Sequence, residues 1–317
     1  MSWLHAASAL LATAVTTAAA DQPIKIDPAS AEQIALQRET YERVTVPVTI
    51  GGMGPYRFMV DTGAQATVVS STLADRLGLT DRSPAVLIGL LSREDVETAA
   101  ISDVGLGSHE FDIRTAPIVP AANLGGADGI LGLDSLQNQR VLIDFVNNRI
   151  LVADAKTLGG NLGYEIVVRA RRRLGQLIIT GAQLNGVDTD VIIDTGSQSS
   201  IGNKALLERL RRARALGENT MTDVNGASLT AAVREGERLS INGMTLNNIP
   251  IMFADTPAFH ALGLDHKPAL VLGIEELKIF RRVAIDFSKH QILFDLPRGT
   301  RSEDIDSFAS QIGGKLS

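Results

Sequence analysis

The chain contains no cysteine among its 317 residues. This absence excludes a disulfide framework, a thiolate nucleophile and any metal site with cysteine ligands. The five histidines are scattered, and His109-Glu110 is followed by Ile113 rather than by the second histidine that a helical zinc site needs. We therefore expect no metal and no cofactor.

Aromatic residues are also scarce, at 4%, so the core must be built from aliphatic side chains. A hydrophobic content of 44% is enough for a large core, as one two-lobed unit or as two domains. The net charge of −6 gives no reason to expect a nucleic-acid partner. Two local basic clusters, at 169–173 and 209–214, are interpreted as a solvated linker and as the outer face of a helix.

Long apolar runs are missing after residue 20. Before it, the apolar stretch from Leu4 to Val15 and the small residues Ala18 to Ala20 predict a signal peptide over residues 1–20, cleaved after Ala20. The alternative is an uncleaved anchor, but the apolar run is short for a membrane span of ~20 residues. We expect a periplasmic or secreted protein without stable membrane insertion after cleavage.

The segments at the two ends of the chain are polar. Residues 21–40 are predicted to be a spacer or a removable pro-segment, and an edge of the folded lobes is a third reading. Ser30 to Gln33 could form a capping box for one short helix there. Residues 298–317 are predicted to be a flexible tail.

One short stretch occurs twice in the chain. In both copies an apolar, β-forming run ends abruptly on Asp-Thr-Gly, first at Asp61 and again at Asp194. Glycine permits the sharp turn that follows. A carboxyl group at the end of a buried strand is costly unless its neighbours hydrogen-bond it. A single Asp-Thr-Gly usually marks a turn, but its repetition indicates a chemical role.

The repetition extends well beyond the triads. An apolar-apolar-Gly element follows each of them, at Ile130–Gly132 and at Val271–Gly273. After each element comes the pattern Arg-Val-x-Ile-Asp-Phe, at 140–145 and at 282–287. The same elements in the same order indicate an internal duplication.

With these paired motifs the chain resembles the aspartic peptidases over residues 41–297. Asp-Thr-Gly-Ala, with Thr67 six places after the aspartate, is similar to the retropepsin half, whereas the second copy, Asp-Thr-Gly-Ser, is more similar to pepsin. The resemblance implies an all-β acid-protease fold, with two pseudo-symmetric β-barrel-like lobes, a few short helices and a cleft between the lobes. The expected divisions are an N-terminal lobe over 41–155, an inter-lobe linker over 156–173 and a C-terminal lobe over 174–297.

The resemblance also implies roles for the repeated residues. Asp61 and Asp194 would share one proton across the cleft, because like charges ~3 Å apart cannot both ionise, and would activate a water for peptide hydrolysis. The two threonines of the triads would cross-link the loops through their hydroxyl groups. The supporting positions implied in this way are Thr62, Gly63, Thr67, Thr195, Gly196, Ser197 and Ser200.

The two copies differ in chemistry at one position. Ala64 stands in the first loop where Ser197 stands in the second. The Ser197 hydroxyl is predicted to donate a hydrogen bond to Asp194 and to favour its charged form, so that the shared proton resides on Asp61.

Two hairpin tips are candidates for flaps over the cleft, at Ile88–Leu91 and at Val224–Ala227. Tyrosine occurs only at 41, 56 and 164, so the flap tyrosine of pepsin-like enzymes has no candidate in the first flap region. This departure favours two small flaps of the retropepsin kind. The candidate flap residues are Gly89, Leu90, Asn225 and Gly226.

Local signals predict the remaining elements. Asn185-Gly186 between apolar runs predicts a hairpin. A helix over 73–77 would be capped by Ser71 or Thr72, and a helix over 206–216 by Asn203. Only short strands and turns are expected between each helix and the following apolar-apolar-Gly element.

The function predicted from the sequence is that of an exported, monomeric aspartic endopeptidase acting on a polypeptide in the inter-lobe cleft. The alternative is a catalytically silent peptide- or protein-binding module on the same fold, because a fold does not by itself imply a function. A purely structural interaction module is a third reading. The presence of both aspartates favours the enzyme.

Overall fold

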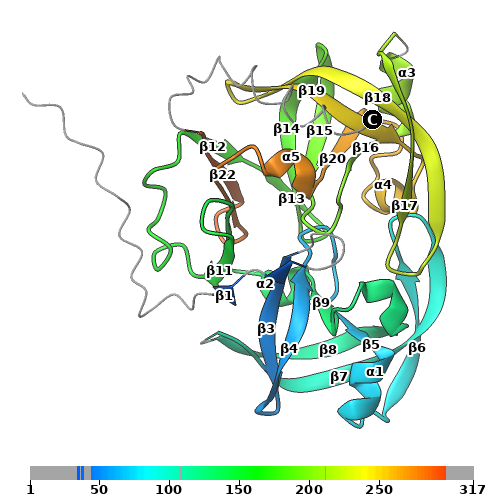
Figure 1. The fold of residues 1–317 in the computed structure, drawn as a ribbon, viewed down its shortest axis with the longest axis vertical. Coiled ribbons are helices and arrows are strands. Elements are labelled where there is room, and N and C mark those ends of the chain that lie inside the picture. The colour runs from blue at the N-terminus through cyan, green and yellow to red at the C-terminus, as the bar shows by residue number, and fades with distance from the viewer. Residues whose placement is uncertain (1–33, 36, 39–43, 108, 211, 298–317) are drawn as a thin grey trace, which may run out of the picture.

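The computed structural model describes residues 34–35, 37–38, 44–107, 109–210 and 212–297 (Figure 1). The predicted signal peptide, the possible capping box and the C-terminal tail lie outside these residues. Strands dominate the described part of the chain, which confirms the all-β prediction. None of its helices is long and apolar enough to cross a membrane.

The elements of the two halves follow one another in the same order. The first half contains β1 (Ile34–Ala35), β2 (Gln37–Arg38), β3 (Val44–Ile50), β4 (Met53–Val60), β5 (Val68–Ser70), α1 (Ser71–Arg76), β6 (Arg82–Ile88), β7 (Arg93–Leu106), β8 (His109–Val119), the 3-10 helix η1 (Ala121–Leu124), β9 (Gly129–Leu131), α2 (Leu133–Leu136), β10 (Arg140–Asp144) and β11 (Arg149–Ala153). The second half contains β12 (Ile166–Arg169), β13 (Arg171–Arg173), β14 (Gln176–Leu184), β15 (Val187–Ile193), β16 (Ser200–Gly202), α3 (Lys204–Arg209), β17 (Ala215–Thr222), β18 (Ser228–Ile241), β19 (Met244–Phe253), α4 (Pro257–Ala261), β20 (Ala269–Leu272), α5 (Ile274–Leu277), β21 (Arg282–Asp286) and β22 (Gln291–Asp295).

Each half forms an eight-stranded sheet of the same topology. The strand order is β2-β3-β4-β9-β5-β8-β7-β6 in the first half and β13-β14-β15-β20-β16-β19-β18-β17 in the second. In both sheets the strand that leads to Asp-Thr-Gly runs parallel to the apolar-apolar-Gly strand, as β4 with β9 and β15 with β20. The sequence duplication is therefore also a structural one (Figure 1).

A third sheet joins the two halves, in the order β1-β11-β10-β21-β22-β12. At its centre β10 pairs antiparallel with β21, and Leu142 lies opposite Ala284. Arg140 lies opposite Asp286 at one end of this strand pair, and Asp144 lies opposite Arg282 at the other end. The repeated Arg-Val-x-Ile-Asp segments thus meet across the axis that relates the halves.

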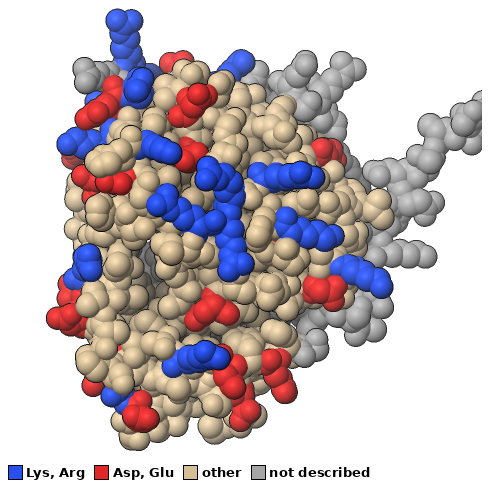
Figure 2. Space-filling model, turned by 180° about the vertical axis from the view of Figure 1, so that it is seen from behind, with Lys and Arg blue, Asp and Glu red and all other residues tan. Residues whose placement is uncertain are grey.

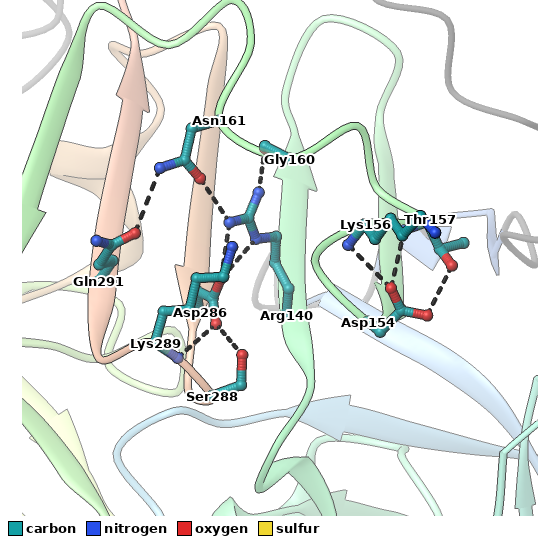
Figure 3. Close-up of polar contacts among 10 residues, drawn as sticks. All are labelled: Arg140, Asp154, Lys156, Thr157, Gly160, Asn161, Asp286, Ser288, Lys289 and Gln291. Atoms are coloured by element: carbon teal, nitrogen blue, oxygen red, sulfur yellow. Dashed lines mark hydrogen bonds and ion pairs between the residues drawn. The ribbon is translucent and has the colours of Figure 1, made fainter.

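A buried ion pair lies within this sheet (Figure 3). The Arg140 side chain is fully buried, and its Nη2 lies 2.7 Å from Oδ2 of Asp286. The same guanidinium donates to Oδ1 of Asn161 at 2.8 Å and to the carbonyl oxygen of Gly160. Asp286 also accepts a hydrogen bond from the Ser288 hydroxyl at 2.6 Å. Both buried charges are therefore hydrogen-bonded, as a buried pair requires.

The main hydrophobic cluster runs through both halves and through the joining sheet. It includes Val46 of the first half, Ile193 of the second and Phe294 of the joining sheet. Most of its members are Val, Leu and Ile, as the low aromatic content predicts. One continuous core thus supports both Asp-Thr-Gly loops.

Several predicted elements have different bounds in the structure. Residues 156–173, expected as a linker, contain two strands: β12 pairs with β22 in the joining sheet, and β13 pairs with β14. Between the first helix and its apolar-apolar-Gly element, where only short strands were expected, β7 has 14 residues and β8 has 11. Long antiparallel ribbons here carry the hairpin tips away from the sheet.

The two predicted helices have other bounds than expected, and only the second is shorter: α1 spans Ser71–Arg76 and α3 spans Lys204–Arg209. The N-cap of α1 is Ser70, whose side chain accepts from the backbone N–H of Leu73, rather than Ser71 or Thr72. Asn203 caps α3 as predicted, but this helix ends at Arg209 rather than at residue 216. The residues from Ala215 onward pair with β18 instead, because tertiary pairing overrides helix propensity.

The basic cluster at 169–173 lies at the surface. Arg171, Arg172 and Arg173 are exposed along β13, at the edge of the second sheet. Basic side chains gather across the middle of the rear face of the molecule, with acidic ones above and below them (Figure 2). Such mixed charge is typical of a solvated surface.

Candidate active site

The two Asp-Thr-Gly loops begin where β4 and β15 end. The backbone N–H of Asp61 donates to the carbonyl oxygen of Leu131 at 3.0 Å, and that of Asp194 to Leu272 at 3.1 Å. Each aspartate is thus fixed by the apolar-apolar-Gly strand beside it. Both side chains are half-buried.

The two loops are cross-linked through their threonines. The backbone N–H of Thr62 donates to Oγ1 of Thr195 at 3.1 Å, and the N–H of Thr195 donates to Oγ1 of Thr62 at 3.1 Å. Each hydroxyl then donates across the interface, from Thr62 to the carbonyl oxygen of Ile193 and from Thr195 to that of Val60. Four buried hydrogen bonds therefore set the separation of the two halves.

Each carboxylate accepts two hydrogen bonds from its own loop. Oδ1 of Asp61 accepts from the N–H groups of Gly63 at 2.8 Å and Ala64 at 2.9 Å. Oδ1 of Asp194 accepts from Gly196 at 2.8 Å and from the next residue at 3.2 Å. In both loops the backbone holds one carboxylate oxygen and leaves the other free to face its partner.

The glycines of the triads allow the carboxyl groups to come together. A side chain at Gly63 would collide with the carboxyl group of Asp194, and one at Gly196 would collide with that of Asp61. Each carboxyl group therefore packs on the loop of the opposite half. This arrangement brings the two aspartates into one site, as the duplicated motifs suggest.

The electrostatics of the pair are unequal. Burial raises the pKa of Asp194 well above its ordinary value, and the negative charge of Asp61 and a hydrogen bond with that carboxyl group raise it further. The N–H groups of Gly196 and Ser197 act in the opposite direction without reversing the shift. A raised pKa means that Asp194 holds a proton more readily than an ordinary aspartate does.

The prediction that the Ser197 hydroxyl polarises the pair is wrong. This hydroxyl donates to the carbonyl oxygen of Ser199 at 2.8 Å, and only the backbone N–H of Ser197 reaches Asp194. The N–H of Ser197 lies farther from its aspartate, at 3.2 Å, than the N–H of Ala64 does from Asp61, at 2.9 Å. This weaker bond is consistent with a proton on Asp194 rather than on Asp61.

Thr67 secures the first loop from behind. Its hydroxyl lies 2.6 Å from Oδ1 of Asp134 and 2.6 Å from the Ser135 hydroxyl, and it accepts from the N–H of Gly132 at 3.1 Å. The backbone N–H of Thr67 donates to the same Asp134 carboxylate. Thr67 thus connects the Asp61 loop to the start of α2.

Ser200 has the equivalent place in the second loop but a different partner. Its hydroxyl donates to Oε2 of Glu276 at 2.7 Å and accepts from the N–H of Gly273 at 3.2 Å. Glu276 is buried, and burial raises its pKa to about 7, although the hydrogen bond from Ser200 acts against the shift. An ionisable carboxyl group therefore lies directly behind the Asp194 loop.

A further contact crosses between the halves. Gln176, which is buried at the start of β14, donates from its side-chain amide to the carbonyl oxygen of Gly63. The second half thereby contacts the Asp61 loop of the first half directly.

The two predicted flap tips cover the same cavity as the aspartates. The cavity has a volume of about 520 Å³ and is lined by both aspartates, by Leu90 from the first hairpin and by Val224 and Gly226 from the second. The predicted flap residue Gly89 lies against the side chains of Asp223 and Asn225 in the opposite tip. Both hairpins therefore meet above the two carboxyl groups.

Sequence reasoning missed several residues that surround the site. The repeat offered a signal for Asp134, Ser135 and Glu276, because they follow the apolar-apolar-Gly elements directly. Asp223 precedes Asn225-Gly226, which marks a turn but gives no sign of a contact with the other hairpin. Among the described residues, no group of three or more Asp, Glu or His side chains is placed to hold a metal ion.

Two carboxyl groups lie on equivalent loops of the two halves, cross-linked by threonines beside a covered cavity, and this arrangement is the candidate active site. A profile of the aspartyl protease family matches residues 46–135 and 180–275, which together make up more than half of the chain. The chain therefore belongs to the aspartyl protease family. No match to this chain was found among curated proteins.

Proposed function

We propose that this protein is an exported aspartic endopeptidase that cleaves extended polypeptides between Asp61 and Asp194. The observation that carries the proposal is the unequal carboxyl pair, in which the pKa of Asp194 is raised by burial and by the charge of Asp61. One charged and one protonated carboxyl group side by side supply a general base and a general acid at once.

The proposed reaction begins with a water held between the two side chains. Asp61 takes a proton from this water, the water oxygen bonds to the carbonyl carbon of the substrate, and Asp194 gives its proton to the carbonyl oxygen. In the second step a hydroxyl proton of the intermediate returns to Asp194, while Asp61 gives its proton to the amide nitrogen. The C–N bond then breaks, and both aspartates regain their starting states.

The covered cavity supports a polypeptide substrate bound in extended form. Its walls combine apolar side chains, such as Met59 and Ile130, with the polar segment Asn219–Thr222 of β17. A main chain in extended form can hydrogen-bond to such a strand while its side chains contact the apolar walls. Secretion or residence in the periplasm belongs to the same proposal and is supported by the pattern of residues 1–20.

The test measures hydrolysis of an unfolded protein with and without pepstatin. We expect pepstatin to inhibit, Asp61→Asn and Asp194→Asn each to abolish hydrolysis, and the double variant to be scarcely worse, because the pair acts as one unit. Thermal stability should hold or rise in the single variants, since a repulsive carboxyl pair is relieved. Asp81→Asn, at an exposed site, is the matched control.

Two outcomes would contradict the proposal. Substantial hydrolysis by either single variant would show that the pair is not the catalytic unit. Binding of unfolded polypeptide by the wild type without any cleavage would favour the silent binding module instead. N-terminal sequencing of the exported chain tests the leader separately, with Asp21 as the expected first residue.

A further inference from the structure

The tips of the two hairpins are joined by an acidic side chain that the catalytic mechanism does not use. Asp223, the residue directly after β17, is only 7% exposed although it lies at a hairpin tip. Its Oδ2 accepts hydrogen bonds from the backbone N–H of Leu91 at 3.1 Å and from the Ser92 hydroxyl at 2.8 Å. Both donors belong to the first hairpin, so one carboxylate bridges the two halves above the cavity.

The same carboxylate also shapes its own turn. Its other oxygen, Oδ1, accepts from the backbone N–H groups of Asn225 at 3.0 Å and Ala227 at 3.0 Å. The Asn225 side chain in turn donates to the Ser92 hydroxyl at 2.9 Å. The turn is thus held rigid in the conformation that presents Oδ2 of Asp223 to the opposite hairpin.

Close packing and apolar contacts accompany these hydrogen bonds. A side chain at Gly89 would lie 2.5 Å from Oδ2 of Asp223, so only glycine permits this approach. Leu90 of the first hairpin packs on a core cluster of the second half that includes Phe259. Val224 of the second hairpin packs on a cluster of the first half that includes Ile130. Each tip therefore rests on the opposite half.

We propose that Asp223 is a specificity-determining residue, whose carboxylate latches the two hairpins over the catalytic cavity and restricts entry to thin, extended chains. The inference rests on the proposed peptidase function. Charge-assisted hydrogen bonds to a buried carboxylate are stronger than neutral ones, so the latch must be broken before a bulky segment can enter. Because only the second hairpin carries the carboxylate, the latch depends on the two halves being unequal.

The position of the hairpins can be measured without any activity. The chain has no cysteine, so Glu94→Cys on β7 and Thr230→Cys on β18 place two spin labels at exposed sites on opposite hairpins. Double electron–electron resonance should give one narrow distance distribution in the otherwise unchanged chain. Adding Asp223→Asn should add a population at longer distance, because an amide cannot accept from both Leu91 and Ser92 while retaining the turn.

A second variant leaves the turn of the second hairpin intact. Ser92→Ala removes the hydroxyl that contacts both Asp223 and Asn225, and should produce the same shift to a smaller extent. Glu218→Gln removes a carboxylate from an exposed position on β17 and should leave the distances unchanged. Distance distributions that coincide for the unchanged chain, Asp223→Asn and Ser92→Ala would overturn the latch.

Substrate selection gives the second readout. We compare kcat/KM for two substrates, a folded protein with a protruding loop and a short peptide. In Asp223→Asn the ratio of the first value to the second should rise about tenfold, which is the effect of losing one charge-assisted hydrogen bond. An unchanged ratio would refute Asp223 as a specificity determinant. If the wild type shows no hydrolysis at all, the proposed function fails, and the distance measurement still decides whether the latch exists.

Discussion

At the scale of single residues, the Asp194 loop differs from the Asp61 loop in the residues that lie behind it. Thr67 contacts Asp134 and Ser135, whereas Ser200 contacts the buried carboxyl group of Glu276. The neighbouring charges are those of Glu275, which raises the Glu276 pKa further, and of Lys278, which lowers it. Lys278 is already paired with Glu275 at 2.9 Å.

The buried carboxyl group of Glu276 predicts that the stability of the folded chain depends on pH. The pKa of Glu276 is about 7 in the folded chain against an ordinary value of 4.5, so the folded state holds a proton that the unfolded state has released between these values. Stability should therefore fall as pH rises from about 4.5 to about 7 and should lose up to about 3 kcal/mol.

Glu276→Gln should remove that dependence, because its neutral side chain resembles the protonated acid. Denaturant unfolding at pH 4.5, 6 and 8 measures the effect. Glu275→Gln, which changes the same charge one residue earlier at a half-exposed site, is the control: it should keep the pH dependence, slightly reduced because the Glu275 charge raises the Glu276 pKa. The assignment fails if the free energy of unfolding of Glu276→Gln runs parallel to that of the wild type across this range.

At the scale of the elements, the cross-link between the two loops should act as one unit. Thr62→Val and Thr195→Val remove a hydroxyl that both accepts and donates, and keep the shape of the side chain. Each should cost about 2 kcal/mol, since a buried N–H and a carbonyl oxygen lose their partners. The double variant should cost less than the sum of the two.

Urea unfolding of the two single variants and the double variant gives the coupling energy. Thr230→Val, in an exposed Thr-Thr pair with Thr220 on β17 and β18, is the control and should change stability little. Additive losses for Thr62→Val and Thr195→Val would mean that the two hydroxyls act independently.

The same elements show how far the sequence alone could lead. The repeated triads predicted the strand ends, and local capping signals predicted the cap at Asn203, because both depend on residues close together in the chain. The early end of α3 was missed because the pairing of β17 with β18 decides it, and the signals near Arg209 are those of a longer helix. The hydrogen bond from the Ser197 hydroxyl to the carbonyl oxygen of Ser199 was also missed. Asp194 and Ser199 are both close to Ser197 in the sequence, and only the loop conformation shows which of them accepts the bond.

The contacts of Asp223 with the first hairpin could not be predicted from local patterns. Its partners Leu91 and Ser92 lie in the other half of the chain, and no motif links them to it. Such contacts arise from the placement of two long ribbons, which depends on the twist and length of β7 and β18.

At the scale of the whole molecule, the joining sheet makes the two halves depend on each other. In the pair β10–β21, one half supplies Arg140 and the other supplies Asp286. Separating the halves would expose two strand edges and leave a buried charge without its partner on each side. We therefore expect that residues 44–155 do not fold alone, and that co-expression with residues 156–297 restores the fold, as measured by circular dichroism and proteolysis.

The buried pair itself allows a sharper test of this dependence. Arg140→Met or Asp286→Leu alone should cost about 3–5 kcal/mol, because each leaves one uncompensated buried charge, whereas the double variant should recover much of the loss. Burial raises the pKa of Asp286, but hydrogen bonds from Ser288 and Arg140 outweigh it and hold the pKa below its ordinary value. The ionised Asp286 thus contributes stability that is present above pH 3.8 and is lost as pH falls through the lowered folded-state pKa. The double variant should lack this acid-dependent loss, and acid unfolding of the two chains side by side measures it. If both chains lost stability equally below pH 3.8, Asp286 would not be the group responsible.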